Sequence, residues 1–64
     1  MKIKDLKKGD FFTKKQIEDP SEDQVWIRGD YDRTEKKYEC VCFGDANRCC
    51  YVDGNKEVFT DFIF

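Results

Sequence analysis

The chain has 64 residues, of which 39% are hydrophobic and 41% charged, and its 12 basic and 14 acidic side chains give a formal net charge of −2. This length predicts a single small domain over residues 1–64, because a chain of about 60 residues buries only about 60% of the surface that its unfolded form exposes. The apolar content excludes simple disorder, and no apolar run reaches the roughly 18 residues of a membrane span. The charged amino end lacks the apolar core of a secretory signal, so we expect a cytoplasmic protein.

The composition favours strands over helices. Ten residues are aromatic, whereas leucine and alanine occur once each, at Leu6 and Ala46. Helices draw heavily on leucine and alanine, while strands favour aromatic and β-branched side chains. No window of helical length repeats apolar residues at the i, i+3, i+4, i+7 spacing, although one helical turn fits residues 3–8. The sequence therefore predicts an all-β fold with room for one helical turn.

Turn-forming segments divide the chain into five strand-like runs. In chain order, the turn signals lie at residues 8–10, 19–23, 32–35, 44–47 and 53–55, which are rich in Gly, Asp and Asn or contain Pro20. The predicted antiparallel strands are residues 11–16, 24–31, 37–43, 48–52 and 57–64. Asp53-Gly54-Asn55 is the strongest hairpin signal. Short strands joined by tight turns after a longer acidic loop predict a small, strongly bent barrel.

Charge sets the register that we expect between the second and third strands. If residues 32–35 form a four-residue loop, Arg28 lies opposite Glu39 and Asp30 lies opposite Lys37. These are two cross-strand pairs of opposite charge, each of which contributes a few tenths to about 1 kcal/mol. A slip by one residue would remove both pairs together. The same register sets Ile27 against Cys40, Val25 against Cys42 and Trp26 against Val41.

This register divides the side chains of the two strands between two faces. The face expected in the core carries Val25, Ile27, Tyr31, Tyr38, Cys40 and Cys42. The other face carries Trp26, Arg28, Asp30, Lys37, Glu39, Val41 and Phe43. Gly29 is expected to mark a β-bulge or a corner of the barrel.

Two resemblances indicate the same architecture. The opening Asp5-Leu6-Lys7-Lys8-Gly9-Asp10-Phe11 is similar to the entry into the first strand of SH3-like barrels in translation factors such as elongation factor P. Across its whole length the chain resembles short SH3-like β-barrel proteins encoded by gut Bacteroidales and their mobile elements. These resemblances imply a small five-stranded SH3-like barrel and imply no activity. The chain lacks the Ala-Leu-Tyr-Asp-Tyr entry and the paired tryptophans of SH3 domains that bind proline-rich peptides.

The chain contains four cysteines that could have a chemical role: Cys40, Cys42, Cys49 and Cys50. Residues two apart on a strand share a face, whereas adjacent residues point oppositely. The registers expected for the turn at residues 44–47 set either Cys49 or Cys50 across from Cys42. Three interpretations stay open. The thiols are reduced and pack as small apolar groups, which we favour, or they form a disulfide, or they form a zinc or redox site.

The sequence lacks histidine and the common catalytic motifs. The chain has no histidine to act as a general base at neutral pH, and its single serine, Ser21, lies in the acidic loop. Neither a G-x-S-x-G motif nor a glycine-rich phosphate-binding loop occurs. We therefore expect a protein that is not an enzyme and that needs no cofactor.

Two kinds of binding surface are predicted. Trp26, Val41 and Phe43 form an aromatic patch of interface composition, which predicts a non-catalytic module that binds a protein partner of unknown identity. The alternative is nucleic-acid binding through six lysines in the first 16 residues: Lys2, Lys4, Lys7, Lys8, Lys14 and Lys15. A pI near 5.0 disfavours this alternative, because electrostatic affinity grows with the number of phosphates neutralised. We expect a monomer or a weak homodimer, since the apolar segment at residues 57–64 must pair within the barrel or across two copies.

Overall fold

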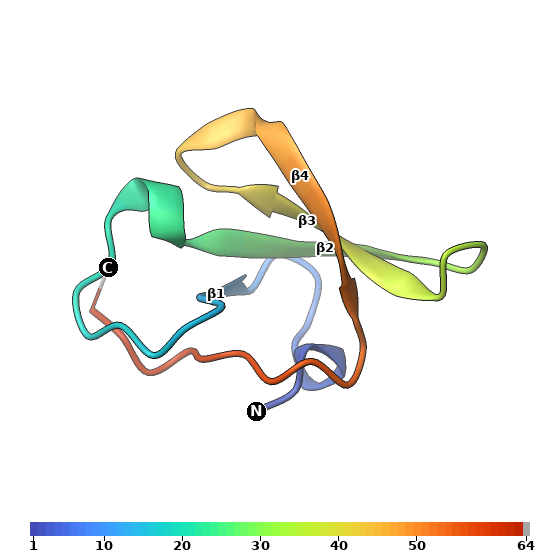
Figure 1. The fold of residues 1–64 in the computed structure, drawn as a ribbon, viewed down its shortest axis with the longest axis horizontal. Helices are drawn as coiled ribbons and strands as arrows, with labels where there is room; N and C mark the ends of the chain where they lie inside the picture. The colour runs from blue at the N-terminus through green and yellow to red at the C-terminus, as the bar shows by residue number, and fades with distance from the viewer. Residues whose placement is uncertain (64) are drawn as a thin grey trace.

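Four antiparallel strands form a single sheet in the computed structural model of the protein, which describes residues 1–63 (Figure 1). In chain order the strands are β1 (Phe11–Phe12), β2 (Trp26–Asp32), β3 (Lys37–Cys42) and β4 (Asp45–Asp53), and they keep this order across the sheet. Two single turns of 3-10 helix, η1 (Ile3–Asp5) and η2 (Glu22–Gln24), are the helical elements of these residues. The predicted all-β class and the predicted helical turn near residues 3–8 are confirmed.

The segment that follows β4 contributes two isolated bridges to the fold. Glu57 pairs with Lys2, and Phe59 pairs with Thr13, which directly follows β1. In Figure 1 this segment, drawn in orange to red, passes below β1 and runs toward η2. Phe64, the last residue of the predicted fifth strand, lies outside the described residues. Within residues 1–63 the sheet is therefore open, with β1 and β4 as its edge strands.

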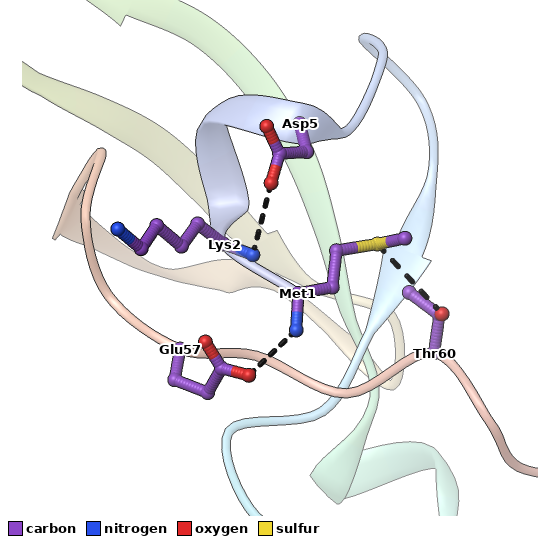
Figure 2. A network of polar contacts seen from close by, with 5 residues as sticks. All are labelled: Met1, Lys2, Asp5, Glu57 and Thr60. Carbon is purple, nitrogen blue, oxygen red and sulfur yellow. Dashed lines mark hydrogen bonds and ion pairs between the residues drawn. The ribbon is translucent and has the colours of Figure 1, made fainter.

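Polar contacts attach the amino end of the chain to this segment (Figure 2). The amino group of Met1 forms an ion pair with the Glu57 carboxylate at 2.6 Å. The Thr60 hydroxyl donates to the Met1 sulfur at 3.9 Å, and the Lys2 amide donates to the Asp5 carboxylate at 3.3 Å. The two Met1 contacts hold the amino end next to the segment after β4, while the Lys2 contact lies within the amino end.

The predicted register between β2 and β3 is wrong by one residue. The observed pairs are Trp26 with Cys42, Ile27 with Val41 and Arg28 with Cys40. Neither of the two predicted charge pairs, Arg28 with Glu39 and Asp30 with Lys37, is formed. As a result, Trp26 and Arg28 share the core face with the two cysteines, and Ile27 lies on the outer face with Val41.

The turn between β2 and β3 moves the adjacent pairing by one residue on each strand, which by itself keeps the side chains on their predicted faces. Asp32 stays on the strand opposite Lys37, so the four-residue loop starts and ends one residue later than predicted. The Asp32 carboxylate accepts hydrogen bonds from the amides of Thr34 at 2.9 Å and Glu35 at 3.2 Å. This is the local bonding by which aspartate initiates turns. Lys36 closes the loop with a φ of 58°, in the left-handed region that residues other than glycine adopt infrequently.

A β-bulge in the middle of β2 shifts the pairing by one residue and turns Trp26, Ile27 and Arg28 to the faces opposite those predicted. Gly29 and Asp30 together face a single residue of β3, Glu39, because the pairing shifts between Arg28 and Tyr31. A Cβ added to Gly29 would collide with the carbonyl oxygen of Glu39. The close approach of the two backbones therefore requires glycine here, and the predicted bulge at Gly29 is confirmed.

The hydrophobic core lies on one face of the sheet. It consists of Ile3, Leu6, Phe12, Trp26, Cys40, Cys42, Val52 and Val58, with Tyr38 and Cys50 packed against it. Of the residues predicted in the core, Val25, Cys40 and Cys42 are buried. Ile27 is only half-buried, and Tyr31 is 48% exposed. The error at Ile27 follows from the wrong register, which also placed Trp26, only 7% exposed, on the outer face. Tyr31 lies opposite Tyr38, which packs against the core, so its exposure reflects its position near the end of β2 and not a change of face.

Candidate functional site

A continuous row of apolar side chains crosses the outer face of the sheet. Phe11 lies opposite Ile27, Ile27 opposite Val41, and Val41 opposite Cys49, so the row spans all four strands. Phe43 extends it, with its ring centroid 5.4 Å from that of Phe11. The two phenylalanines are 41% and 42% exposed. We call these five residues the outer patch.

The structure separates the three residues that were predicted to bind a protein partner. Val41 and Phe43 belong to the outer patch, but Trp26 lies on the opposite face and is part of the core. Sequence reasoning missed Phe11, because the adjacent Phe11 and Phe12 carry no signal for which ring faces inward. It missed Ile27 because the predicted register turned that side chain into the core.

Acidic side chains border the outer patch next to the pair formed by Val41 and Cys49. Glu39 lies opposite Tyr51 in the β3–β4 ladder and, two residues before Val41, on the same face of the sheet. The carboxylates of Glu39 and Asp32 raise the pKa of the Tyr51 phenol, because they disfavour a further negative charge beside them. This end of the patch is therefore negatively charged.

A second group of acids lies beside the turn that contains Phe43. A Cβ added to Gly44 would meet Glu22 Cβ at 3.0 Å and Asp23 Oδ1 at 3.1 Å, so η2 lies against the turn that contains Phe43 and Gly44. Asp45 follows this turn directly, and all three acids are exposed. Negative charge thus lies near both ends of β3.

Trp26 lines a second surface feature, a hollow of about 300 Å³ next to residues 14–17. The Lys14 ammonium lies 4.1 Å from the centroid of the Trp26 ring, and the Arg48 guanidinium lies 5.6 Å from it. Cations interact favourably with an aromatic face at these distances. Lys15 and Asp23 also line the hollow, so three cations and one carboxylate surround it.

The six lysines predicted to bind nucleic acid do not form one surface. Lys14 and Lys15 meet at the Trp26 hollow. Lys8 instead forms an ion pair with Asp30, with 3.0 Å between Nζ and Oδ1. The remaining three, Lys2, Lys4 and Lys7, lie in and around η1. Sequence reasoning missed Arg48, since it lies in the irregular stretch 46–48 of β4, which the sequence does not predict.

Cys40 and Cys50 lie directly opposite each other on β3 and β4. Cys42 lies opposite Asp45, so the predicted pairing of Cys42 with Cys49 or Cys50 is wrong. The reason is a two-residue turn at residues 43–44, after which residues 46–48 leave the regular ladder. This irregular stretch shifts the later part of β4 relative to β3.

The four thiols are free and differ strongly in exposure. Cys40 and Cys42 are buried, Cys50 is half-buried, and Cys49 is exposed. Burial, together with the neighbouring Cys50, raises the pKa of the Cys40 thiol to about 11. The Cys42 thiol points at backbone carbonyl oxygens of η2, at 3.8 Å from Glu22 and 3.7 Å from Asp23. In the described part of the chain, no three or more His, Cys, Asp or Glu residues are grouped so that they could hold a metal ion.

No helix in residues 1–63 is long and apolar enough to cross a membrane. Comparisons with known proteins gave no match to a family model, to a curated protein or to a solved structure. The outer patch, the Trp26 hollow and the cysteines are therefore the features from which a function is inferred.

Proposed function

We propose that this chain is a non-catalytic protein-binding module, and that its outer patch binds an apolar segment flanked by Lys or Arg on a partner protein. The observation that carries this proposal is the apolar row from Phe11 through Ile27 and Val41 to Cys49, which is continuous across the sheet. Aromatic and aliphatic side chains at the centre of a surface with charges at its rim are typical of protein interfaces.

The charges at the rim define the chemistry of the partner. Glu39 is exposed and forms no ion pair with any residue of the described chain. Glu22 and Asp45 are exposed beside the turn that contains Phe43. Lys or Arg on the partner would complement these carboxylates, whereas Asp or Glu would be repelled. The aliphatic stems of Lys and Arg would also cover apolar surface next to the patch.

A peptide array tests this proposal. Peptides with the same apolar centre and with either Lys/Arg or Asp/Glu flanks are probed with labelled protein. The binding site of retained peptides is then mapped by changes in amide chemical shifts. We expect retention of the basic set, with the largest changes at Ile27, Val41 and Cys49. Equal retention of both sets, or changes centred away from the patch, would contradict the proposal.

A pair of variants sharpens this test. Val41→Glu introduces a charge at the centre of the patch and should weaken peptide binding at least about tenfold, which corresponds to about 1.4 kcal/mol. Asn55→Glu adds the same charge in the exposed turn after β4, away from the patch, and should leave binding within about twofold. Equal effects of the two substitutions would show that the site is elsewhere.

A second candidate function is nucleic-acid binding, and the convergence of Lys14, Lys15 and Arg48 on Trp26 favours it. Because Lys14 already covers the indole ring, contact with phosphates is expected in place of base stacking. Trp26 is the only tryptophan, so its fluorescence reports on a titration with single-stranded DNA. Three phosphate contacts predict a slope of about −2 in log affinity against log salt. Binding that is independent of salt or of Arg48→Ala would contradict this candidate.

We also propose that the fold is an SH3-like barrel in which residues 57–63 take the place of the fifth strand. The support is the pair of backbone hydrogen bonds between Thr13 and Phe59, at 2.8 Å and 3.0 Å, beside β1. Hydrogen exchange tests this assignment. The Phe59 amide should be protected about as well as amides of β2, and exchange at the rate of an exposed loop would contradict it.

A further inference from the structure

The pair formed by Cys40 and Cys50 has the arrangement that a cross-strand disulfide needs. The two residues are directly opposed in an antiparallel ladder, and both side chains lie on the core face. Opposed residues in such a ladder have Cα atoms about 4.5 or 5.5 Å apart. Disulfides join Cα atoms about 4.4 to 6.8 Å apart. A bond between the two sulfurs therefore requires rotation of side chains and no change of register.

The other two cysteines are arranged differently. Cys49 is adjacent to Cys50 on the same strand, so it points to the outer face, where it is exposed. Cys42 is only 1% exposed and lies opposite Asp45. The register therefore selects one pair of thiols out of the four.

We propose that Cys40 and Cys50 are a modification site, at which a cross-strand disulfide forms by exchange with a small disulfide such as glutathione disulfide. In the first step the Cys50 thiolate attacks one sulfur of glutathione disulfide. A bond forms between Cys50 and that glutathione, the bond between the two glutathiones breaks, and one glutathione thiolate leaves. In the second step the Cys40 thiolate attacks the Cys50 sulfur and expels the second glutathione. The two protons lost by the cysteines are taken up by the two glutathione thiolates, so two protein thiols are oxidised and one disulfide is reduced.

The difference in exposure sets the order of these steps. Cys50 is half-buried on an edge strand and can meet a small disulfide from solvent, whereas Cys40 has no exposed surface. Burial raises the pKa of Cys40 to about 11, so this residue is almost fully protonated at neutral pH and reacts slowly with external disulfides. Once Cys50 carries glutathione, the sulfur to be attacked lies next to Cys40, and this proximity favours the second step.

The cross-link would join β4 to β3 just beyond the irregular residues 46–48. Because a disulfide restricts the unfolded chain, the oxidised protein should have a higher thermal midpoint of unfolding than the reduced protein. The outer patch lies on the opposite face of the sheet. Formation of the disulfide is therefore independent of the proposed binding function, and either can fail without the other.

The test uses the full chain with Cys49→Ser, which removes the exposed thiol. The native protein is incubated at neutral pH in glutathione buffers with increasing fractions of glutathione disulfide, then quenched with acid, unfolded and alkylated. We expect a product that has lost two hydrogen atoms and takes up one alkyl group, on Cys42. Trypsin cleaves after Arg48 and so separates Cys50 from Cys40 and Cys42. Fragmentation of the linked peptides should assign the bond to Cys40.

Two further substitutions in the same background separate the steps. Cys40→Ser should stop the reaction after the first step, so that glutathione accumulates on Cys50. Cys50→Ser changes a half-buried position and should abolish both the disulfide and the adduct, even if Cys40→Ser fails to fold. A bond that includes Cys42, glutathione adducts without any Cys40–Cys50 bond, or a disulfide that persists in Cys50→Ser would overturn the proposal.

Discussion

Arg28 lies opposite Cys40 in the β2–β3 ladder, one position away from the Glu39 that charge pairing would select. The Arg28 guanidinium instead lies 4.2 Å from the centroid of the Tyr38 ring, within the range of a cation–π interaction. The same one-residue difference brings Trp26 into the core and creates the outer patch. The register of these two strands thus determines both the core and the proposed binding surface.

The energies of the competing registers explain which one is adopted. Two exposed cross-strand charge pairs contribute about 2 kcal/mol together at most. Burial of a tryptophan removes about 150–250 Å² from water, which stabilises the fold by about 4–6 kcal/mol at 25 cal/mol per Å². The alternative register would bury Ile27 instead, which contributes about 1.5–3 kcal/mol. The larger apolar area of the indole therefore favours the register that buries Trp26, although it leaves Arg28 and Glu39 unpaired with each other.

Trp26→Ala should severely destabilise the protein. Replacing a buried Trp by Ala costs about 3–5 kcal/mol, and a domain of this size has a total stability of about 3–10 kcal/mol at 0.05–0.15 kcal/mol per residue. Urea unfolding followed by far-UV circular dichroism measures the loss. Phe43→Ala, at a ring that is 42% exposed, is the control and should cost about 1 kcal/mol or less. A Trp26→Ala protein as stable as the wild type would contradict the burial of Trp26.

Gly29→Ala should destabilise the sheet by about 1–3 kcal/mol, since the added methyl group collides with the Glu39 carbonyl and forces the backbones apart. Gly54→Ala is the matched control, because its Cβ would meet Tyr38 Cε2 at 3.4 Å, an ordinary contact distance. The shift in urea midpoint should therefore be clearly larger for Gly29→Ala. Equal shifts would argue against the bulge.

Raising the pH should weaken the fold through Cys40. Its pKa is raised from 9.0 to about 11, so between these values the folded state binds more protons than the unfolded state. Stability must then fall as the pH rises through this range, by at most about 2–3 kcal/mol, given about 1.4 kcal/mol for each pKa unit. Urea unfolding under reducing conditions measures the effect. Cys40→Ala should lose less stability than the wild type over the same range, and parallel pH profiles would contradict the expectation.

Lys8→Ala should have almost no effect on stability. The ion pair with Asp30 is short, at 3.0 Å, but its side chains are 68% and 76% exposed. Exposed ion pairs contribute about 0.2–1 kcal/mol, and less at higher salt. The urea midpoint of the variant should match that of the wild type at physiological ionic strength. A loss above about 1 kcal/mol would indicate that Lys8 has a further structural role.

Features of the fold that depend on local chemistry could be predicted from the sequence. Gly9 adopts a φ of 94° in the predicted turn before β1, and the Asp10 carboxylate accepts a hydrogen bond from the Lys7 amide at 2.9 Å. The turn after β4 is also formed, with the Asn55 amide donating to Asp53 at 2.9 Å. In each case a glycine, aspartate or asparagine provides the geometry within a few residues.

Features that depend on distant segments could not be predicted. The bulge at Gly29 and Asp30 turns Trp26, Ile27 and Arg28 to the faces opposite those predicted, whereas the later residues Tyr38, Cys40 and Cys42 stay on the predicted face. The two-residue turn before β4 likewise pairs Cys50 with Cys40 instead of Cys42. Arg48, in the irregular stretch 46–48, lies 5.6 Å from the centroid of the Trp26 ring. These contacts depend on the register between strands. The alternation of residue types does not distinguish two registers that differ by one residue.

Close contacts between backbone protons of β2 and β3, measured by nuclear Overhauser spectroscopy, test the register most directly. We expect cross-strand contacts that pair Ile27 with Val41 and Arg28 with Cys40. Contacts that pair Ile27 with Cys40 and Arg28 with Glu39 would contradict this register, and with it the outer patch.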